Sequence, residues 1–520
     1  MTIRRILIAN RGEIAVRIIR TAQKLGIETV LAVSEADRGS LGARMADRAL
    51  CIGPARPAES YLRVETIVQA ALGSGCDAIH PGYGFLSERA ALAQLCEDEG
   101  VIFIGPTAAQ IEAVGDKLRA RAEAIAADVP VVPGGPVESM AQAQALAQEI
   151  GAPILVKAVG GGGGRGMKLV EDLKDLTATM DMASAEAGAA FGDARVYLER
   201  YVAQGRHVEV QVLGDGAGTV IHLGERDCSV QRRYQKLIEE TPAPHLPQEI
   251  RDAMHEAAVR FAARLHYRGA GTVEFLYDVA RNQFYFLEMN ARIQVEHPVT
   301  EEVTGVDLIA EQIAIASGEG LRLTQADVRI HGAAIECRIN AEDPARDFMP
   351  SPGTVASAHW PSGEGIRVDT HIVDGAKIPP FYDSMVAKII THGPDRASAL
   401  DRLKTALRET RIQGVSTNIV FQAELLADPD FARGGVDTGF PGAGRELSMA
   451  DIKLVETSLR DGNQCLWGAL GVDTARTLSI APVLERVGFK AIDFTTSTHM
   501  GVAVRYKQED PWERIRLMKQ

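Results

Sequence analysis

The chain opens with short apolar runs that alternate with amphipathic segments. Residues 3–9 (IRRILIA) predict a buried strand, VRIIRTAQKLGI an amphipathic helix, and ETVLAV a second strand. The same order returns in YLRVETIVQAALGSG, CDAIHPGYGF, ALAQLCEDEG and VIFIGP. Repeated units of this kind place their strands side by side, so residues 1–115 are expected to form an open, mostly parallel α/β sheet.

The pattern changes after a long helical segment. The segment AAQIEAVGDKLRARAEAIAADV predicts continuous helix up to VPVVPGG, and strand pairs then run from residue 154 to about 300. These pairs are ILVKAV with GMKLV, HVEVQVL with TVIHLGERD, and GTVEFLYD with QFYFLEMN. Residues 330–440 add the strands HGAAIECRI, VASAHW and MVAKIITHG and the helix ASALDRLKTALRET. The loop FARGGVDTGFPGAGRELS is interpreted as a linker, after which IKLVETSLRDG begins another βα pattern.

A glycine-rich loop, VKAVGGGGGRGMKLV, lies inside one of these strand pairs. Gly161, Gly163 and Gly166 fit GxGxxG, but a dinucleotide fingerprint requires a helix after the loop and MKLV predicts a strand. The loop is therefore interpreted as a glycine hairpin whose backbone amides approach a phosphate chain. Lys157 and Arg165 at its edges favour that function over a mere flexible linker.

Two carboxylates are expected to face each other in the hairpin GTVEFLYDVARNQFYFLEMN. A turn near residues 280–282 places Glu274 opposite Glu288, with Asn290 on the same face. Opposed like charges are destabilising unless something bridges them, and Mg²⁺ commonly takes one or two carboxylates together with nucleotide phosphates. The pattern thus predicts a magnesium site.

Strict alternation then continues through residues 288–296, E-M-N-A-R-I-Q-V-E. We expect one extended strand with its polar side chains on one face, at Glu288, Asn290, Arg292, Gln294 and Glu296. The apolar flanks argue against a solvated surface strand. A second alternating strand, AIECRINAED, offers Arg338. Metal and lysines to neutralise phosphates, Arg292 to hold a small planar anion and Glu296 as a base would together serve phosphoryl transfer.

Composition narrows the class of protein. A chain of 520 residues is too long for a single hydrophobic core, so several packed units are expected. A composition of 46% hydrophobic and 24% charged residues is typical of soluble globular proteins. A net charge of −13 argues against a broad nucleic-acid surface, and the absence of a long apolar run argues against membrane insertion, so a cytoplasmic protein is expected. The six cysteines contain no CxxC pair and are interpreted as reduced thiols.

Several long motifs, in order, resemble biotin carboxylase, the ATP-grasp component of biotin-dependent carboxylases of acyl-CoA or pyruvate type. They are RILIANRGEIAVRIIR, HPGYGFLSE, GGGGGRGM, HVEVQVLGD, GERDCSVQRRYQK, EMNARIQVEHPVTEEVTGVDL, ECRINAEDP and YDSMVAKI. The resemblance implies an α/β and α+β multidomain chain. Its parts are a Rossmann-like N-terminal domain (1–115), an ATP-grasp domain (116–320) with a glycine-rich lid (about 130–203), and a biotin carboxylase C-terminal domain (330–442).

The resemblance also implies a reaction: ATP phosphorylates bicarbonate to carboxyphosphate, and the carboxyl group then passes to a ureido nitrogen of biotin. It places ATP at Lys117, Lys157, Gly162, Gly163, Gly164, Glu199, Val202, His207 and Gln231, with Glu199 to Val202 along the adenine. It places Mg²⁺ or Mn²⁺ at Glu274, Glu288 and Asn290, and bicarbonate at Arg292, Gln294 and the Val295 amide. Glu296 becomes the base, Arg338 the stabiliser of the biotin enolate, and Lys236 a further anion contact, with Arg292 also catalytic.

Two features depart from the family pattern. Tyr234 in RRYQK stands where the family usually has a histidine near the ribose, which is expected to alter nucleotide affinity. Residues 451–520, beginning with KLVETSLRDGNQ, resemble the start of a pyruvate-carboxylase-type carboxyltransferase (β/α)₈ barrel, with Asp461 at a remnant metal position. These residues are too few to close a barrel, so an incomplete TIM-barrel segment is expected.

The partners follow from the same resemblance. No AMKM-type biotin-accepting motif occurs, so the biotin is expected on a carrier domain or protein elsewhere, with a carboxyltransferase domain or subunit and a homodimeric assembly. Two alternatives remain open at this point. A carbamoyl-phosphate-synthetase-type ATP-grasp ligase predicts amine-dependent product, and a non-catalytic nucleotide-binding subunit predicts ATP binding without turnover.

Overall fold

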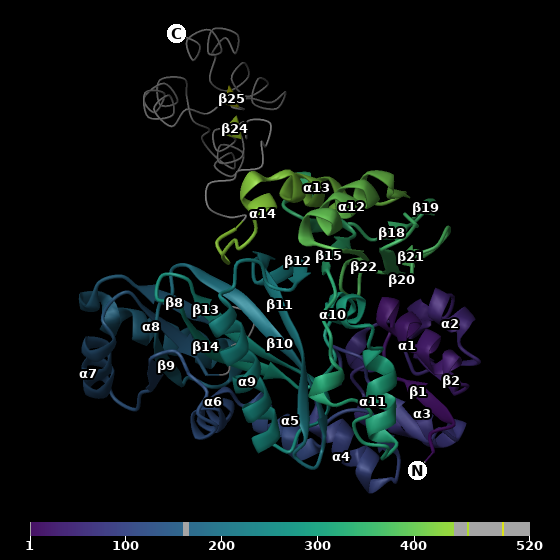
Figure 1. Ribbon diagram of the computed structural model, residues 1–520, viewed down its shortest axis with the longest axis horizontal. Helices are drawn as coiled ribbons and strands as arrows, with labels where there is room; N and C mark the ends of the chain where they lie inside the picture. The colour runs from purple at the N-terminus through teal and green to yellow at the C-terminus, as the bar shows by residue number, and fades with distance from the viewer. Residues whose placement is uncertain (1, 160–165, 441–454, 457–490, 493–520) are drawn as a thin grey trace, which may run out of the picture. The chain divides into compact units, whose positions relative to one another are not determined.

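The computed structural model describes residues 2–159 and 166–440, together with one strand pair near the C-terminus (Figure 1). The chain divides into two compact units, Met1–Gly444 and Arg445–Gln520. In the second unit, β24 (Val455–Glu456) and β25 (Ala491–Ile492) pair in parallel. The predicted lid glycines Gly162, Gly163 and Gly164, and Asp461, lie outside the described residues.

The first part of unit 1 is a five-stranded parallel sheet in the order β3-β2-β1-β4-β5, which confirms the expected α/β opening. Its strands are β1 (Arg5–Ile8), β2 (Glu28–Val33), β3 (Arg48–Cys51), β4 (Ala78–His80) and β5 (Ile102–Phe103). Its helices are α1 (Gly12–Lys24), α2 (Leu41–Met45), α3 (Val64–Ser74) and α4 (Ala90–Asp98). Successive side chains enter different cores, Leu7 one and Ile6 and Ile8 the other, because both faces of the sheet are covered.

A small antiparallel sheet carries the glycine loop. Its order is β6-β9-β7-β8, with β6 (Gly134–Pro136), β7 (Ile154–Ala158), β8 (Met167–Val170) and β9 (Val196–Arg200). The strands on either side of the loop, β7 and β8, pair as a hairpin, so a strand and not a helix follows the glycines, as predicted. Helices α7 (Met140–Ile150) and α8 (Leu176–Phe191) flank this sheet.

The largest sheet has eight antiparallel strands in the order β14-β13-β10-β11-β12-β15-β22-β20. They are β10 (Gly205–Asp215), β11 (Val220–Arg232), β12 (Gln235–Thr241), β13 (Arg268–Asp278), β14 (Gln283–Asn290), β15 (Ala333–Asn340), β20 (Ile366–Thr370) and β22 (Met385–Gly393). Two of the three predicted strand pairs, β10 with β11 and β13 with β14, lie in this sheet. The third is the β7–β8 hairpin of the small sheet. The β12–β15 pairing makes one continuous sheet from segments that the sequence assigned to separate domains.

Helices and short strands complete this unit. The helices are α5 (Ala108–Gly115), α6 (Lys117–Ala126), α9 (Gln248–Arg264), α10 (His297–Thr304), α11 (Leu308–Ala316), α12 (Arg396–Glu409), α13 (Ile419–Ala427) and α14 (Pro429–Arg433). The short strands are β16 (Glu342–Asp343), β17 (Met349–Pro350), β18 (Gly353–Thr354), β19 (Ser357–His359), β21 (Lys377–Ile378) and β23 (Arg411–Gln413).

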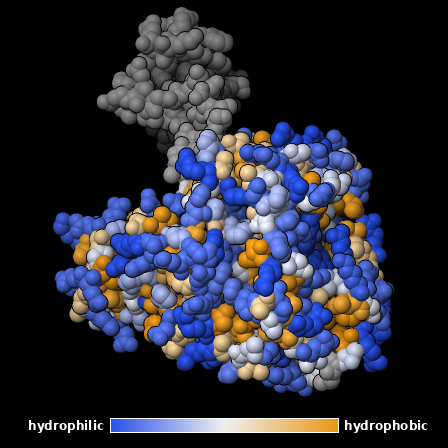
Figure 2. Space-filling model, in the orientation of Figure 1, coloured by the Kyte–Doolittle hydropathy of each residue, from blue (hydrophilic) through white to orange (hydrophobic). Residues whose placement is uncertain are grey.

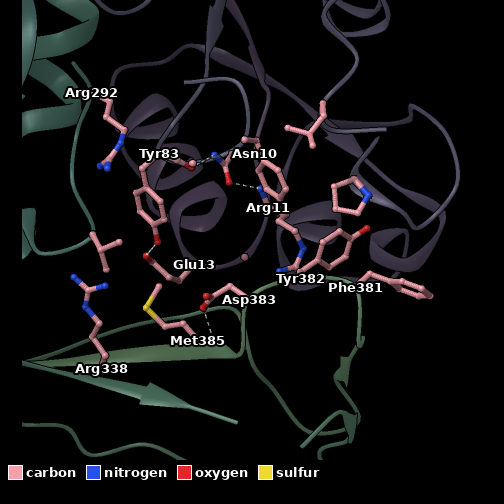
Figure 3. A pocket seen from close by; sticks show the side chains of 16 residues that line it. Asn10, Arg11, Glu13, Tyr83, Arg292, Arg338, Phe381, Tyr382, Asp383 and Met385 are labelled. Atoms are coloured by element: carbon pink, nitrogen blue, oxygen red, sulfur yellow. Dashed lines mark hydrogen bonds between the residues drawn. The ribbon is translucent and has the colours of Figure 1, made fainter. Parts of the chain in front are cut away.

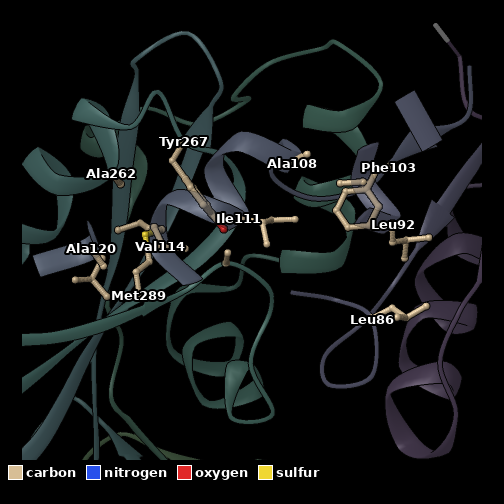
Figure 4. Packing of buried hydrophobic residues seen from close by; sticks show 14 of the residues in the cluster. Leu86, Leu92, Phe103, Ala108, Ile111, Val114, Ala120, Ala262, Tyr267 and Met289 are labelled. Atoms are coloured by element: carbon tan, nitrogen blue, oxygen red, sulfur yellow. The ribbon is translucent and has the colours of Figure 1, made fainter. Parts of the chain in front are cut away.

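Apolar packing joins these layers. Phe261 of α9 packs in the same core as Val208 and Val210 of β10. Ile111 of α5 and Met289 of β14 belong to that cluster as well (Figure 4). On the face seen in Figure 2, apolar side chains are scattered among hydrophilic ones. Within the described part of the chain, no helix has the length and apolar character needed to span a bilayer.

One expectation about an element was wrong, and the start of the proposed linker differs. The continuous helix after residue 107 is broken at Asp116, whose side chain accepts a hydrogen bond from the Arg119 amide and so caps a new helix, α6. The proposed linker begins inside α14, where the side chain of Asp428 caps the first turn. The chain then returns to the large sheet, since the Thr438 amide donates to the Gly205 carbonyl.

Candidate active site

The opposed carboxylates lie where the hairpin pattern placed them. Glu274 of β13 pairs directly with Glu288 of β14. The turn of the hairpin differs from the predicted one, because it has four residues, 279–282, between the paired Asp278 and Gln283. A β-bulge between Phe275 and Glu274 adds one residue to β14 and brings Glu288 back opposite Glu274.

The single strand predicted over residues 288–296 was wrong. β14 ends at Asn290, and an irregular segment leads into α10 at His297. The polar side chains nevertheless converge, since Asn290 Nδ2 and Gln294 Nε2 each lie 2.9 Å from Glu274 Oε1. Hydrogen bonds to Glu274 therefore keep the two amides together where strand alternation no longer does.

Lys236 of β12 is the centre of the network. Its Nζ donates to Glu209 Oε2 and Glu296 Oε1, both at 2.6 Å, and lies 3.2 Å from Glu274 Oε1. Burial lowers the pKa of Lys236, but the surrounding anions outweigh burial and raise this pKa well above its usual value. A permanent ammonium thus holds three buried carboxylates that would otherwise repel one another.

Glu296 lies between two cations. Its second oxygen accepts from Arg338 Nη2 at 3.0 Å, and Arg338 Nε also donates to Glu239 at 2.6 Å. Burial raises the pKa of Glu296, but Lys236 and Arg338 lower it below its usual range. Glu296 is therefore ionised near neutral pH, which is the protonation state of a base.

The two opposed carboxylates differ in their surroundings. Burial opposes ionisation of Glu274, but Lys236 and His207 lower its pKa well below the usual value. Burial and the charge of Glu274 raise the pKa of Glu288. Lys236 already contacts Glu274 Oε1, so Glu274 Oε2, 3.1 Å from His207 Nε2, and the half-buried Glu288 are the oxygens left for a divalent cation.

The side chains of His207, Glu209 and Glu274 form a second group of potential metal ligands, whose ligand atoms lie within 4.8 Å of one another. Lys236 occupies the side of this group next to Glu209, at 2.6 Å, which disfavours a second cation there. The carboxylates fit Mg²⁺ through Glu274 and Glu288. Asn290 uses its Nδ2 for Glu274 and its Oδ1, at 2.6 Å, for Arg292.

Arg292 faces a cavity of about 630 Å³. Its Nε donates to Glu88 Oε2 at 2.9 Å and its Nη2 to Asn290. Figure 3 shows Arg292 and Arg338 along one side of this cavity, with Phe381 and Tyr382 at the far end. Val295 and Arg11 also line the cavity, which thereby combines three guanidinium groups with the aromatic rings of Phe381 and Tyr382.

The predicted nucleotide residues fall into two groups. His207 and Gln231 belong to the network, with the Gln231 Nε2 and His207 Nδ1 atoms 3.2 Å apart. Lys157 instead donates to Glu199 at 2.5 Å across the small sheet.

Three further positions bear on the nucleotide. Val202 packs beside Val132 and Tyr285, and Lys117 is the first residue of α6, where its charge lowers the pKa of Glu288. Tyr234 is exposed in the β11–β12 turn with φ of 65°.

Several partners of the site cations were missed by sequence reasoning. Glu88, Glu209 and Glu239 hold Arg292, Lys236 and Arg338, respectively. Arg226, fully buried, donates to Glu209 Oε1 at 2.6 Å. The alternation of His207, Glu209 and Gln211 within an apolar strand was a usable signal for Glu209. Glu88 lacks an alternation signal of this kind, although it is the last residue of the HPGYGFLSE motif.

Comparison with known proteins identifies the family. Three family models match in order: Biotin carboxylase, N-terminal domain (residues 2–111), Carbamoyl-phosphate synthase L chain, ATP binding domain (116–324), and Biotin carboxylase C-terminal domain (336–441). A biotin carboxylase of Nostoc sp. is 52% identical over 84% of this chain and 98% of its own length.

Solved structures agree. The biotin carboxylase domain dimer of Hydrogenobacter thermophilus 2-oxoglutarate carboxylase, in complex with MgADP, ADP and bicarbonate, has a TM-score of 0.80 and 46% identity over 85% of this chain and 97% of that chain. Rhizobium etli pyruvate carboxylase has a TM-score of 0.79 and 36% identity over 100% of this chain and 53% of that chain. The chain therefore belongs to the biotin carboxylase family.

Proposed function

We propose that the site carboxylates biotin on a carrier, using ATP and bicarbonate, as the first half-reaction of a biotin-dependent carboxylase. One observation carries the proposal: Glu296 is held ionised by Lys236 and Arg338 beside a cavity that Arg292, Val295 and Arg338 line. The order of the three family models favours this function over a carbamoyl-phosphate-type ligase.

Bicarbonate binds in this proposal to Arg292, Gln294 and the Val295 amide. Glu88 and Asn290 fix the guanidinium of Arg292 through Nε and Nη2, so the directions of its in-plane N–H donors are set before an anion arrives. Gln294 is oriented by its bond to Glu274. The relative in complex with MgADP and bicarbonate supports these ligands.

Glu296 removes the bicarbonate proton. In the resting site its proton affinity is low because Lys236 and Arg338 both contact the carboxylate. An anion that enters beside Lys236 and Arg338 shares their charge, so it raises the proton affinity of Glu296 at the moment the base is required. Arg338 then stabilises the enolate of biotin, which occupies the cavity.

Nucleotide is held by Lys117, Lys157, His207 and Gln231, with Glu199 to Val202 along the adenine and Gly162 to Gly164 closing over the phosphates. Glu274 and Glu288 hold Mg²⁺, with Asn290 alongside; when bound, this ion neutralises phosphate charge. The bond between Lys157 and Glu199, at 2.5 Å, is exchanged for a phosphate contact. Tyr234 adjusts nucleotide affinity from its exposed turn.

The wider assembly extends the proposal. The domains are residues 1–115, 116–320 with a lid at about 130–203, and 330–442, and the partners are a biotin carrier, a carboxyltransferase and a second copy of the chain. Residues 451–520 are the beginning of a carboxyltransferase barrel. The parallel pairing of β24 with β25, as in βα units, and the full coverage of this chain by the Rhizobium etli enzyme support that assignment.

ADP release measured with and without biotin tests this function. The parent chain should release ADP in the presence of bicarbonate faster when biotin is added. Glu296→Ala and Arg338→Ala should each remove the biotin-stimulated rate, while Glu256→Ala, an exposed position on α9, should retain it. Stimulation by an amine instead of biotin would favour the carbamoyl-phosphate-type alternative, and ATP binding without turnover a non-catalytic subunit.

A further inference from the structure

Lys388 is a fully buried lysine in the middle of the apolar strand β22. Its cross-strand neighbours are Arg338 on β15 and Asp369 on β20. A buried ammonium requires polar partners to offset the loss of hydration, and a second cation directly opposite adds to that requirement. The partners of Lys388 therefore indicate why it is there.

Two groups hold the ammonium. Lys388 Nζ donates to the main-chain carbonyl of Val295 at 2.6 Å and lies 3.3 Å from Glu13 Oε1. The same Glu13 oxygen accepts a short hydrogen bond from the Tyr83 hydroxyl. Burial lowers the pKa of Lys388, but Glu13 and other anions outweigh it and raise this pKa above its usual value. Lys388 thus remains charged.

The bond to Val295 fixes a segment of the site that has no regular structure of its own. The preceding carbonyl, that of Gln294, lies 2.7 Å from His297 Nδ1, which must be the donor because a carbonyl cannot donate. The two carbonyl groups that flank the Val295 α-carbon therefore both accept hydrogen bonds from buried side chains, His297 and Lys388. Val295 itself faces the cavity together with Arg292 and Arg338.

Glu13 and Tyr83 face the same cavity from the N-terminal part of the chain (Figure 3). Lys388 joins this wall to the Val295 segment, since one ammonium contacts both Glu13 and the Val295 carbonyl. Loss of the ammonium would leave the Val295 carbonyl and the Glu13 carboxylate buried without this partner, and the Val295 carbonyl would no longer be anchored.

We propose that Lys388 is a positioning residue for bicarbonate binding, which orients the Gln294–Val295–Glu296 main chain through the Val295 carbonyl and locks it to Glu13. This inference rests on the proposed function, and Lys388 does not itself touch the substrate. Its loss should weaken bicarbonate binding selectively, because the nucleotide residues lie on other strands.

The test is steady-state kinetics of biotin-stimulated ADP release by Lys388→Met. The KM for bicarbonate should rise about tenfold, as for loss of a buried charge-assisted hydrogen bond, while the KM for ATP stays within about twofold. Thr391→Val is the matched control, because Thr391 is on the same strand and donates to the Ala399 carbonyl at 2.8 Å, away from the site. It should leave both KM values unchanged.

Two variants keep the test decisive if Lys388→Met does not fold. Glu13→Gln keeps an acceptor for Tyr83 but removes the anion beside Lys388, and should raise the KM for bicarbonate about threefold. Adding Glu13→Gln to Lys388→Met removes both buried charges, so it should recover thermal stability but leave the KM for bicarbonate high.

The outcomes separate the inference from the function. An unchanged bicarbonate KM in Lys388→Met, or in Glu13→Gln where only that variant folds, overturns the role of Lys388. An equal rise in the KM for bicarbonate and for ATP also overturns it, because that result indicates general damage. Absence of biotin-stimulated ADP release by the parent chain instead rejects the proposed function.

Discussion

Shared cations set the chemistry of individual residues in this site. Lys236 contacts Glu209, Glu274 and Glu296, and Arg338 contacts Glu239 and Glu296. Burial raises the pKa of Glu239 to about 7 even with Arg338 beside it. An incoming anion therefore competes with carboxylates for cations already in place, and this competition is the basis of the role given to Glu296.

The guanidinium group of Arg292 leads to a prediction at the residue scale. Arg292→Lys keeps the positive charge but loses the planar group that donates to Glu88 through Nε and to Asn290 through Nη2. We expect the KM for bicarbonate to rise about tenfold because Lys cannot replace a fixed bidentate donor. The measurement is the bicarbonate dependence of biotin-stimulated ADP release.

Arg260→Lys is the control for that substitution. Arg260 is exposed on α9, and its nearest carboxylate, Glu256, is 3.7 Å away. The KM for bicarbonate of Arg260→Lys should therefore match that of the parent. Equal bicarbonate KM values for Arg292→Lys and the parent would show that charge alone is required at Arg292.

Single residues were predictable where local alternation carried the signal. Glu274 and Glu288 followed from hairpin register, and the structure pairs them. Glu239 did not, because its partner Arg338 lies on a strand far along the chain, and neither segment predicts the β12–β15 pairing alone. The roles assigned to these side chains stay predictions.

At the scale of elements, strand pairs were easier to predict than their ends. Period-two alternation persists past Asn290, yet β14 stops there because the segment turns into α10 at His297. The helix break at Asp116 was also missed, although Asp is a favoured N-cap, because the hydrophobic pattern continues across it. The bulge in the β13–β14 hairpin leaves no trace in the pattern.

The contact between α9 and β11 gives a prediction about pH. Glu225 of β11 is buried and accepts from Arg251 at 2.8 Å, and its other oxygen lies 2.7 Å from His255. Burial alone raises the pKa of Glu225, but His255 and Arg251 outweigh it and lower the pKa from 4.5 to about 2. The resulting stabilisation is present above pH 4.5 and is lost as the pH falls toward 2.

Glu225→Gln should therefore lower the free energy of unfolding at pH 7 by about 3 kcal/mol. It should also flatten the loss of stability on acidification, since the titrating group is gone. Urea unfolding at several pH values measures both effects. Glu256→Gln on α9, where the ion pair is exposed, should change stability by less than about 1 kcal/mol. Equal effects of the two substitutions would contradict this account.

At the scale of the whole unit Met1–Gly444, one sheet and its surrounding helices hold the site. Strands β10 to β15 supply Glu209, Glu274, Glu288, Lys236 and Arg338, and the irregular segment before α10 supplies Arg292 and Glu296. Glu88 and Tyr83 approach from the N-terminal segment. The sequence predicted the parallel opening and the later antiparallel pairs. It could not predict their joining, because contacts between remote segments leave no periodic signal.

A buried ion cluster connects these parts. Arg17 of α1 donates to Glu301 of α10 at 2.7 Å and to Asp307, which caps α11, at 2.8 Å. Arg17→Met should lower the free energy of unfolding by about 3–5 kcal/mol, because it leaves buried carboxylates short of a cation. Arg5→Met, which removes a more exposed pair with Glu28, should cost at most about 1 kcal/mol.

Urea unfolding of both variants measures the difference. If Arg17→Met is no less stable than Arg5→Met, the cluster does not contribute to the docking of α1 on α10 and α11.

Transfer of labelled carboxyl from bicarbonate to biotin tests the central claim most directly. With ATP, Mg²⁺ and biotin, the parent chain should form carboxybiotin that carries the label, and Glu296→Ala should form almost none. ATP hydrolysis by the parent without any label on biotin would contradict the account.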